Sequence, residues 1–217
     1  MPRDVVATLD SMIAERSLLK HPFYQAWTAG TLTLERLQNY VVEYYPHVDA
    51  FPRYLSAIHS RCADIAARQA LLENLIEEER GAENHPELWL RFAEAIGVSR
   101  DRVMDSTRSA SSTSLVRTFT ELAESGHVAS GLSALYAYES QIPRVATAKI
   151  DGLKRFYGIT GERGLAFFTV HEQADVCHAR TGADLIALHC ATDRDRELAI
   201  EAGDRALGAL WSLLDAC

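Results

Sequence analysis

Features that mark several common protein classes are missing from this sequence of 217 residues. No apolar run reaches the roughly 20 residues that a membrane-spanning helix needs, and the first residues contain no secretory apolar segment. None of the four cysteines belongs to a CxxC pair, which argues against a zinc knuckle or a dithiol redox site. We therefore expect a cytoplasmic protein with free thiols and no membrane partner.

Basic residues are also scarce relative to acidic ones. The chain has 22 Lys and Arg against 30 Asp and Glu, which gives a net charge of −8, and only three of the basic residues are lysines. Binding along a phosphate backbone needs a basic face, so this balance argues against nucleic acid as a partner. The sequence leaves open whether the protein is a monomer or a homodimer, and it does not identify an electron donor.

Alternating strand patterns are absent as well, and nearly every segment has the period of a helix. No Gly- or Ser-rich linker interrupts the chain, so we expect one all-α domain over residues 1–217, folded as a compact helical bundle. Pro46 and Pro52 are expected to kink or break the long helix that follows Thr33. The Ser-, Thr- and Arg-rich stretch 99–114 is predicted to be a loop with a helical turn. Further helices are predicted over residues 66–85, 127–157, 162–180 and 182–191.

Acidic and imidazole side chains interrupt the apolar faces of three predicted helices. Glu78 and His85 are seven residues apart, which places them about 20° apart around a single helix and therefore on one face. The same face carries Leu71 and Leu75, so it has the character of a core stripe that contains two polar side chains.

The second and third stripes lie further along the chain. His171, Asp175 and His178 have spacings of four and three residues and also share one helix face. Glu139 lies on another apolar stripe, and Pro143, which cannot donate to the Glu139 carbonyl, should kink the helix beside it. The Glu78 and His85 pair alone is more often a satisfied core or surface pair, and the His171, Asp175 and His178 spacing alone is equally compatible with metal and with packing. The three patterns together favour metal.

The six side chains form a coherent ligand set for two divalent cations. A lone buried carboxylate is costly unless it is paired or bound to metal. Three carboxylates bring −3 against the +4 of two divalent ions, and mixed N and O donors favour iron or manganese. We therefore predict a dinuclear site whose ligands are Glu78, His85, Glu139, His171, Asp175 and His178. The remaining histidines are expected to be surface or packing residues: His21, His47, His59, His127 and His189.

Three segments resemble a known family: residues 75–89, residues 136–143 and the motif His171-x3-Asp175-x2-His178. They are similar to the haem-oxygenase-like di-metal oxidases, and within these to the chlamydial death-domain-associating (CADD-like) proteins, which are self-sacrificing p-aminobenzoate synthases. The similarity covers nearly the whole chain and fills all six ligand positions. It implies a haem-oxygenase-like bundle of seven to eight helices that holds two metal ions, either Fe/Fe or Mn/Fe.

The resemblance also implies a function. An enzyme of this kind would make p-aminobenzoate, a folate precursor, from one of its own tyrosines, and would consume O2 and an external reductant. Tyr24 matches the sacrificed tyrosine, and Lys149 matches the lysine that donates the amino nitrogen. Tyr40 and Tyr138 match aromatic residues of the family's pocket. Without the resemblance, Lys149 would be interpreted as a snorkelling surface lysine and Tyr24 as an aromatic residue at the edge of the core.

One feature of the predicted geometry opposes this function. On a single straight helix, the ten residues between Glu139 and Lys149 span about 15 Å, which is more than a lysine side chain comfortably reaches. A kink at Pro143, or a pocket between the two side chains, is needed to close that gap.

Three other functions remain open. The first is a multiple-turnover di-iron oxygenase that acts on a small amine, an amino acid or a fatty acid at the same metals. The second is a thiamine-salvage hydrolase or a cofactorless quinone-forming oxidase of the same fold, and neither needs six metal ligands. The third is an interaction protein that recognises helical death domains, a role for which the sequence shows no large exposed apolar stripe.

Overall fold

Helices make up every regular element of the part of the chain that the structure describes, which is residues 4–217 apart from the side chains of residues 173–179. The structure is a computed structural model. In chain order its elements are α1 (Val5–Glu15), the 3-10 helix η1 (Leu18–Lys20), α2 (Pro22–Ala29), α3 (Leu34–Arg61), α4 (Ile65–Glu79), α5 (His85–Ala95), α6 (Arg100–Asp105), α7 (Ala110–Ala123), α8 (Val128–Glu139), α9 (Ile142–Phe156), α10 (Glu162–His189) and α11 (Asp193–Asp215). The predicted all-α fold is confirmed.

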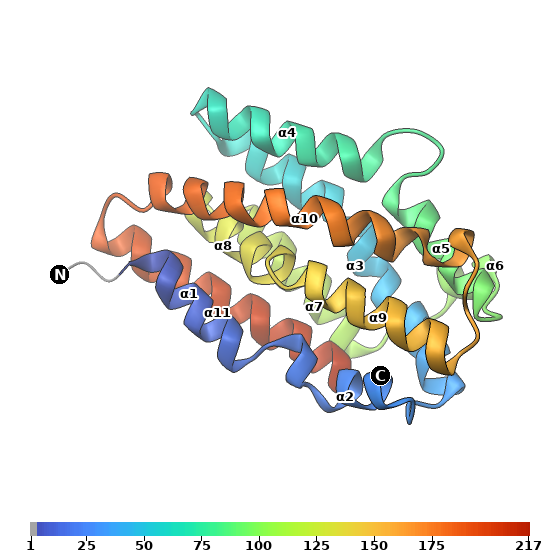
Figure 1. Cartoon of the computed structure of the whole chain (residues 1–217). Coiled ribbons are helices and arrows are strands. Elements are labelled where there is room, and N and C mark those ends of the chain that lie inside the picture. Colours follow the sequence, from blue (N-terminus) through green and yellow to red (C-terminus); the bar gives the residue numbers. More distant parts are fainter. Residues whose placement is uncertain (1–3) are drawn as a thin grey trace.

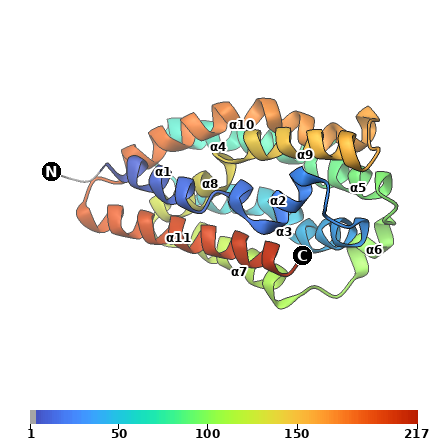
Figure 2. The same ribbon diagram turned by 60° about the horizontal axis from the view of Figure 1, so that its bottom comes forward.

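The long helices form a bundle with an aromatic interior. Figures 1 and 2 show α4 and α10 on one side and α11 on the opposite side, with α3 and α8 between them. Helix α10 packs against α5, α8 and α9, while α3 packs against α4, α5 and α7. The largest fully buried side chains are mostly aromatic, and these aromatic rings come from α2, α3, α5, α7 and α10. Over the described residues, none of the helices combines the length and the apolar character that crossing a bilayer requires.

The predicted helix over residues 66–85 is wrong, because the chain breaks between α4 and α5. Gly81 adopts a left-handed conformation with φ of 80°, which is easy for glycine and ends the helical path. Asn84 then caps α5, since its side-chain oxygen accepts from the Glu87 amide at 3.0 Å. Pro86 follows in the first turn of α5, where its missing N–H costs nothing. Glu78 and His85 therefore lie on different helices.

Of the kink or break predicted at Pro46 and Pro52, the structure excludes the break. The helix runs from Leu34 to Arg61 through both Pro46 and Pro52. Pro46 cannot donate to the Val42 carbonyl, but the Arg108 guanidinium donates to that oxygen at 2.9 Å. A side chain from outside the helix thus replaces the hydrogen bond that the proline removes.

Three other boundaries differ from the sequence prediction. The predicted helix over residues 127–157 is divided, because α8 ends at Glu139 and α9 begins at Ile142 with a proline in its first turn. Residues 162–180 and 182–191, predicted as two helices, belong mostly to the single helix α10. The stretch 99–114, predicted as a loop with a helical turn, contains α6, a short loop and the start of α7.

Candidate metal centre and aromatic pocket

Three of the six predicted ligands meet inside the bundle. Glu78 comes from the end of α4, His85 from the start of α5 and His171 from the middle of α10, and all three are buried. One ligand atom from each residue lies within 4.8 Å of those of the other two. Glu78 Oε2 and His85 Nδ1 are 2.6 Å apart, and the two imidazole rings are 4.4 Å apart between centroids. A carboxylate and two imidazoles placed so closely in the interior form a set that a divalent cation can bind.

The turn between α4 and α5 produces this meeting. The sequence places Glu78 and His85 on one face of a continuous helix, whereas the structure brings them together across the turn of residues 80–84. His85 is the first residue of α5, so its side chain can turn back toward the last turn of α4. The proximity was therefore predicted for the wrong geometric reason.

The orientation of His171 favours coordination through Nε2. Its Nδ1 donates to the Phe167 carbonyl at 2.6 Å, and a neutral imidazole that donates from Nδ1 has its lone pair on Nε2. Hydrogen bonding of the second ring nitrogen to a carbonyl is typical of metal-ligating histidines, because it fixes both tautomer and ring orientation.

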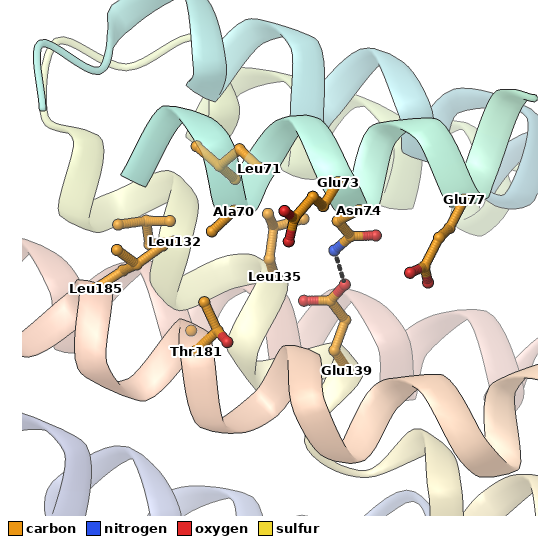
Figure 3. Close-up of a pocket in the computed structure, with 11 residues that line it drawn as sticks. Ala70, Leu71, Glu73, Asn74, Glu77, Leu132, Leu135, Glu139, Thr181 and Leu185 are labelled. Atoms are coloured by element: carbon orange, nitrogen blue, oxygen red, sulfur yellow. Dashed lines mark hydrogen bonds between the residues drawn. The ribbon is translucent and has the colours of Figure 1, made fainter. Parts of the chain in front are cut away.

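Glu139 is the last residue of α8 and borders the same site. It lines a small cavity of about 10 Å³ together with Glu78 and His171. Its Oε1 accepts a hydrogen bond from Asn74 Nδ2 at 2.8 Å, as Figure 3 shows. Glu139 does not belong to the close group of three, so the structure places it next to that group. The other two predicted ligands, Asp175 and His178, lie outside the described side chains.

A second, larger cavity reaches Glu139 from the surface. It has a volume of about 160 Å³ and lies between α4, α8 and α10. The exposed carboxylates of Glu73 and Glu77 line it, and Asn74 and Glu139 form its buried polar part (Figure 3). The cavity thus joins solvent to one predicted metal ligand and could admit a small molecule or an ion.

Lys149 lies in an aromatic pocket and not on the surface, so its interpretation as a snorkelling lysine is wrong. Only 3% of the residue is exposed, and Nζ donates to the Tyr40 hydroxyl at 2.8 Å. Six aromatic rings have their centroids within 6.0 Å of Nζ: Tyr24, Trp27, Tyr40, Tyr44, Trp89 and Phe168. Burial lowers the pKa of Lys149 to about 7, so a large fraction of the amine is neutral at neutral pH.

Tyr24 is part of the same pocket. It is 2% exposed, so it lies inside the core and not at its edge. Its hydroxyl lies 3.2 Å from that of Tyr40, so Lys149, Tyr40 and Tyr24 form a hydrogen-bonded series. Burial raises the pKa of the Tyr24 phenol by more than the hydrogen bond to Tyr40 lowers it, and the phenol is therefore protonated at neutral pH. The structure thus brings together the residues that the family resemblance selects as tyrosine and lysine substrates.

Aromatic contacts connect this pocket with the candidate metal centre. The Trp89 ring lies 5.8 Å from Tyr40 and 4.8 Å from Phe167, and Phe167 lies 4.3 Å from the His171 ring. On a second side, Tyr44 donates to the hydroxyl of Tyr138, the neighbour of Glu139, at 2.7 Å. The two regions are therefore adjacent parts of one buried site.

His47 is a residue of this site that the sequence analysis missed. It is 1% exposed and lines the small cavity with Glu78, Glu139 and His171. Burial lowers the pKa of His47 to about 3, so its imidazole is neutral. The sequence does contain a pattern that includes His47. An aromatic stripe with alternating spacings of four and three residues runs along α3: Tyr40, Tyr44, His47, Phe51 and Tyr54.

Comparison with known proteins identifies the family. Residues 38–211 match the model of a family described as iron-containing redox enzymes. The chain belongs to that family. It is 45% identical to a 4-aminobenzoate synthase of Chlamydia muridarum, with 95% of this chain and 87% of the relative covered. It is also 40% identical to a 4-aminobenzoate synthase of Nitrosomonas europaea, over 95% and 88%, and 28% identical to a pyrroloquinoline-quinone synthase of Ruegeria pomeroyi, over 98% and 89%.

Solved structures confirm the haem-oxygenase-like fold. A TenA homologue from Pseudomonas syringae superposes with a TM-score of 0.85 at 15% identity, covering 99% of this chain and 92% of that one. A CADD-like protein from Nostoc punctiforme gives a TM-score of 0.78 at 17% identity, covering 98% and 94%. The resemblance inferred from the three sequence segments is therefore confirmed, and the chain is a redox enzyme of this family.

Proposed function

We propose that this chain is an oxygen-dependent 4-aminobenzoate synthase that builds its product from its own Tyr24 and Lys149. The observation that carries the proposal is the buried series Lys149–Tyr40–Tyr24 beside a group of side chains that could hold a metal ion. The names of the relatives that are 40% and 45% identical support the same product. The family description supports an iron-dependent redox reaction.

The donor set fits a pair of metal ions. Glu78 and Glu139 are buried carboxylates, and a cation would offset the cost of their burial. His85 and His171 add nitrogen donors, and such a mixture suits iron or manganese, as Fe/Fe or Mn/Fe. Asp175 and His178 would complete the set. Bound metals of this type supply the capacity to bind and reduce dioxygen, with an external reductant as the source of further electrons.

The protein's own residues prepare the two substrate side chains. The pocket excludes water from Lys149 and so provides a neutral amine whose lone pair is available for bonding to carbon. Tyr40 acts as a positioning residue, because its hydroxyl bonds to Lys149 Nζ and to the Tyr24 hydroxyl. Nζ lies 5.5 Å from the centroid of the Tyr24 ring, so nitrogen and ring are neighbours before any reaction.

The test is a single-turnover experiment. Protein purified without oxygen is loaded with iron or with manganese and iron, then exposed to air with a reductant and analysed by intact-mass spectrometry. We expect at most one 4-aminobenzoate per chain, with mass changes at Tyr24 and Lys149. Tyr24→Phe and Lys149→Arg should retain metal but form no product. Lys154→Arg, which alters an exposed lysine, should behave as the wild type.

A second candidate is a multiple-turnover oxygenase with a free substrate. The cavity of about 160 Å³ that reaches Glu139 favours it, because a small amine or amino acid could enter there. Sustained product formation from an added substrate, undiminished by Tyr24→Phe, would establish this function and exclude the self-sacrificing one. Activity of metal-free protein would instead favour the quinone-forming alternative.

A further inference from the structure

His47 is a buried polar group that the proposed chemistry does not use. Its ring is surrounded by the aromatic side chains of Tyr44, Phe51, Phe119 and Tyr138, at centroid distances between 4.8 and 5.9 Å. Among the described residues, neither Nδ1 nor Nε2 has a hydrogen-bond partner. A histidine in such a setting keeps a desolvated donor and a desolvated acceptor, which is unfavourable unless something else satisfies them.

The position of His47 shows where a partner could sit. The imidazole lines the same small cavity as Glu78, Glu139 and His171. The volume of this cavity, about 10 Å³, is about what a single water molecule requires. A ligand bound there would contact the candidate metal ligands on one side and the unsatisfied imidazole on the other.

We propose that His47 is a positioning residue that hydrogen-bonds a water-sized ligand held at the metal centre, such as water, dioxygen or a small anion. This role rests on the proposed metal-dependent function. A neutral imidazole suits it, because it offers one N–H donor and one lone pair without adding charge to the cavity. The aromatic rings around it hold its orientation and exclude competing water. The same cavity without an imidazole would leave such a ligand with fewer partners.

The test uses cobalt(II) in place of the native metals and azide as the ligand, so that Tyr24 is not consumed. Azide affinity is measured from the visible absorption of cobalt. For His47→Leu we expect the azide dissociation constant to rise about five- to tenfold at unchanged cobalt stoichiometry. His47→Gln, which restores hydrogen-bonding groups, should recover part of that loss. Phe119→Leu is the matched control, because it disturbs the packing around His47 and keeps the imidazole.

Thermal unfolding without metal gives a second readout. Because His47→Leu removes two unsatisfied nitrogens, we expect the Tm of the metal-free protein to stay at or above that of the wild type, by up to about 4 °C. A Tm reduced as much as in Phe119→Leu would show that His47 serves chiefly as a packing residue, and would overturn the proposal.

The azide results separate this role from the proposed function. Equal azide affinity in wild type and His47→Leu, or an equal loss in Phe119→Leu, would reject the role of His47 and leave the metal centre intact. A wild-type protein that takes up neither cobalt nor iron would reject the proposed function, and the role of His47 with it.

Discussion

The two polar regions inside the bundle are satisfied in different ways. Around Lys149, the amine and the hydroxyls of Tyr40 and Tyr24 bond to one another within an aromatic box. Around Glu78, two carboxylates and three imidazoles border one small cavity or lie beside it. The first region carries little charge, because burial lowers the pKa of Lys149 to about 7, whereas the second concentrates negative charge that a cation would balance.

This difference indicates that the two regions have different roles within one site. The carboxylate region is suited to metal ions, and the aromatic region keeps an amine neutral next to a protonated phenol. Trp89 and Phe167 lie between the two regions, and their rings are in contact with each other. Because different side chains make up the two regions, mutations in the carboxylate region should chiefly affect metal binding, and mutations in the aromatic region should chiefly affect the titration of Lys149.

The largest effect should come from the carboxylate region. We expect Glu78→Gln to abolish metal binding, because it removes a charged ligand and keeps nearly the same volume. Metal content after loading and gel filtration measures this. Glu79→Gln, which neutralises the exposed neighbour, is the control and should bind metal normally. Full metal occupancy in Glu78→Gln would contradict the assignment of the centre.

A smaller effect is expected in the aromatic region. There, Lys149 should make the free energy of unfolding depend on pH, by on the order of several kcal/mol. Burial lowers the pKa of Lys149 from 10.5 to about 7, so between these values the unfolded chain binds more protons than the folded one. Burial of Lys149 therefore destabilises the folded chain to its full extent below about pH 7. This destabilisation decreases as the pH rises from about 7 toward 10.5.

Comparison with Lys149→Met, which has no titratable amine, isolates this contribution. The free energy of unfolding of the wild type, relative to the variant, should increase from about pH 7 to about pH 10 in urea titrations. Lys154→Met, at an exposed position, should show no such trend. A pH-independent difference for Lys149→Met would mean that the buried amine keeps its proton.

The sequence was sufficient for the helical nature of the fold, but not for the places where helices end. Periodicity reports which residues face the core, and it cannot separate one helix from two that meet at a sharp turn. Gly81 and Asn84 were the local signals for the turn after Glu78. The continuity of α3 through Pro46 depends on Arg108, which is 62 residues away along the chain, so no local pattern could show it.

The same limit applies to the site. Glu78, His85 and His171 could be found because polar residues on apolar stripes are conspicuous. The burial of Lys149 could not, because its box is assembled from rings on α2, α3, α5 and α10. His47 was overlooked because a single histidine within an aromatic stripe looks like packing until its nitrogens are seen to lack partners among the described residues.

The smallest effect should come from Asn74, which lines the larger of the two cavities that border Glu139. Its amide donates to Glu139 Oε1 at 2.8 Å and so holds the carboxylate in one orientation. We expect Asn74→Leu to weaken metal affinity by about tenfold, the lower end of what loss of an orienting partner costs, because Glu139 remains present but less fixed. Competition with a chelator measures this affinity.

Glu73→Gln provides the control for Asn74→Leu, since Glu73 lines the same larger cavity but is exposed. It should change metal affinity by much less than tenfold, because an exposed charge is screened by solvent. Unchanged affinity in Asn74→Leu would show that Glu139 needs no support from α4. An equal loss in Glu73→Gln would show that the effect of Asn74→Leu is not specific to the orientation of Glu139. Either result would reject a specific role of Asn74 in orienting Glu139.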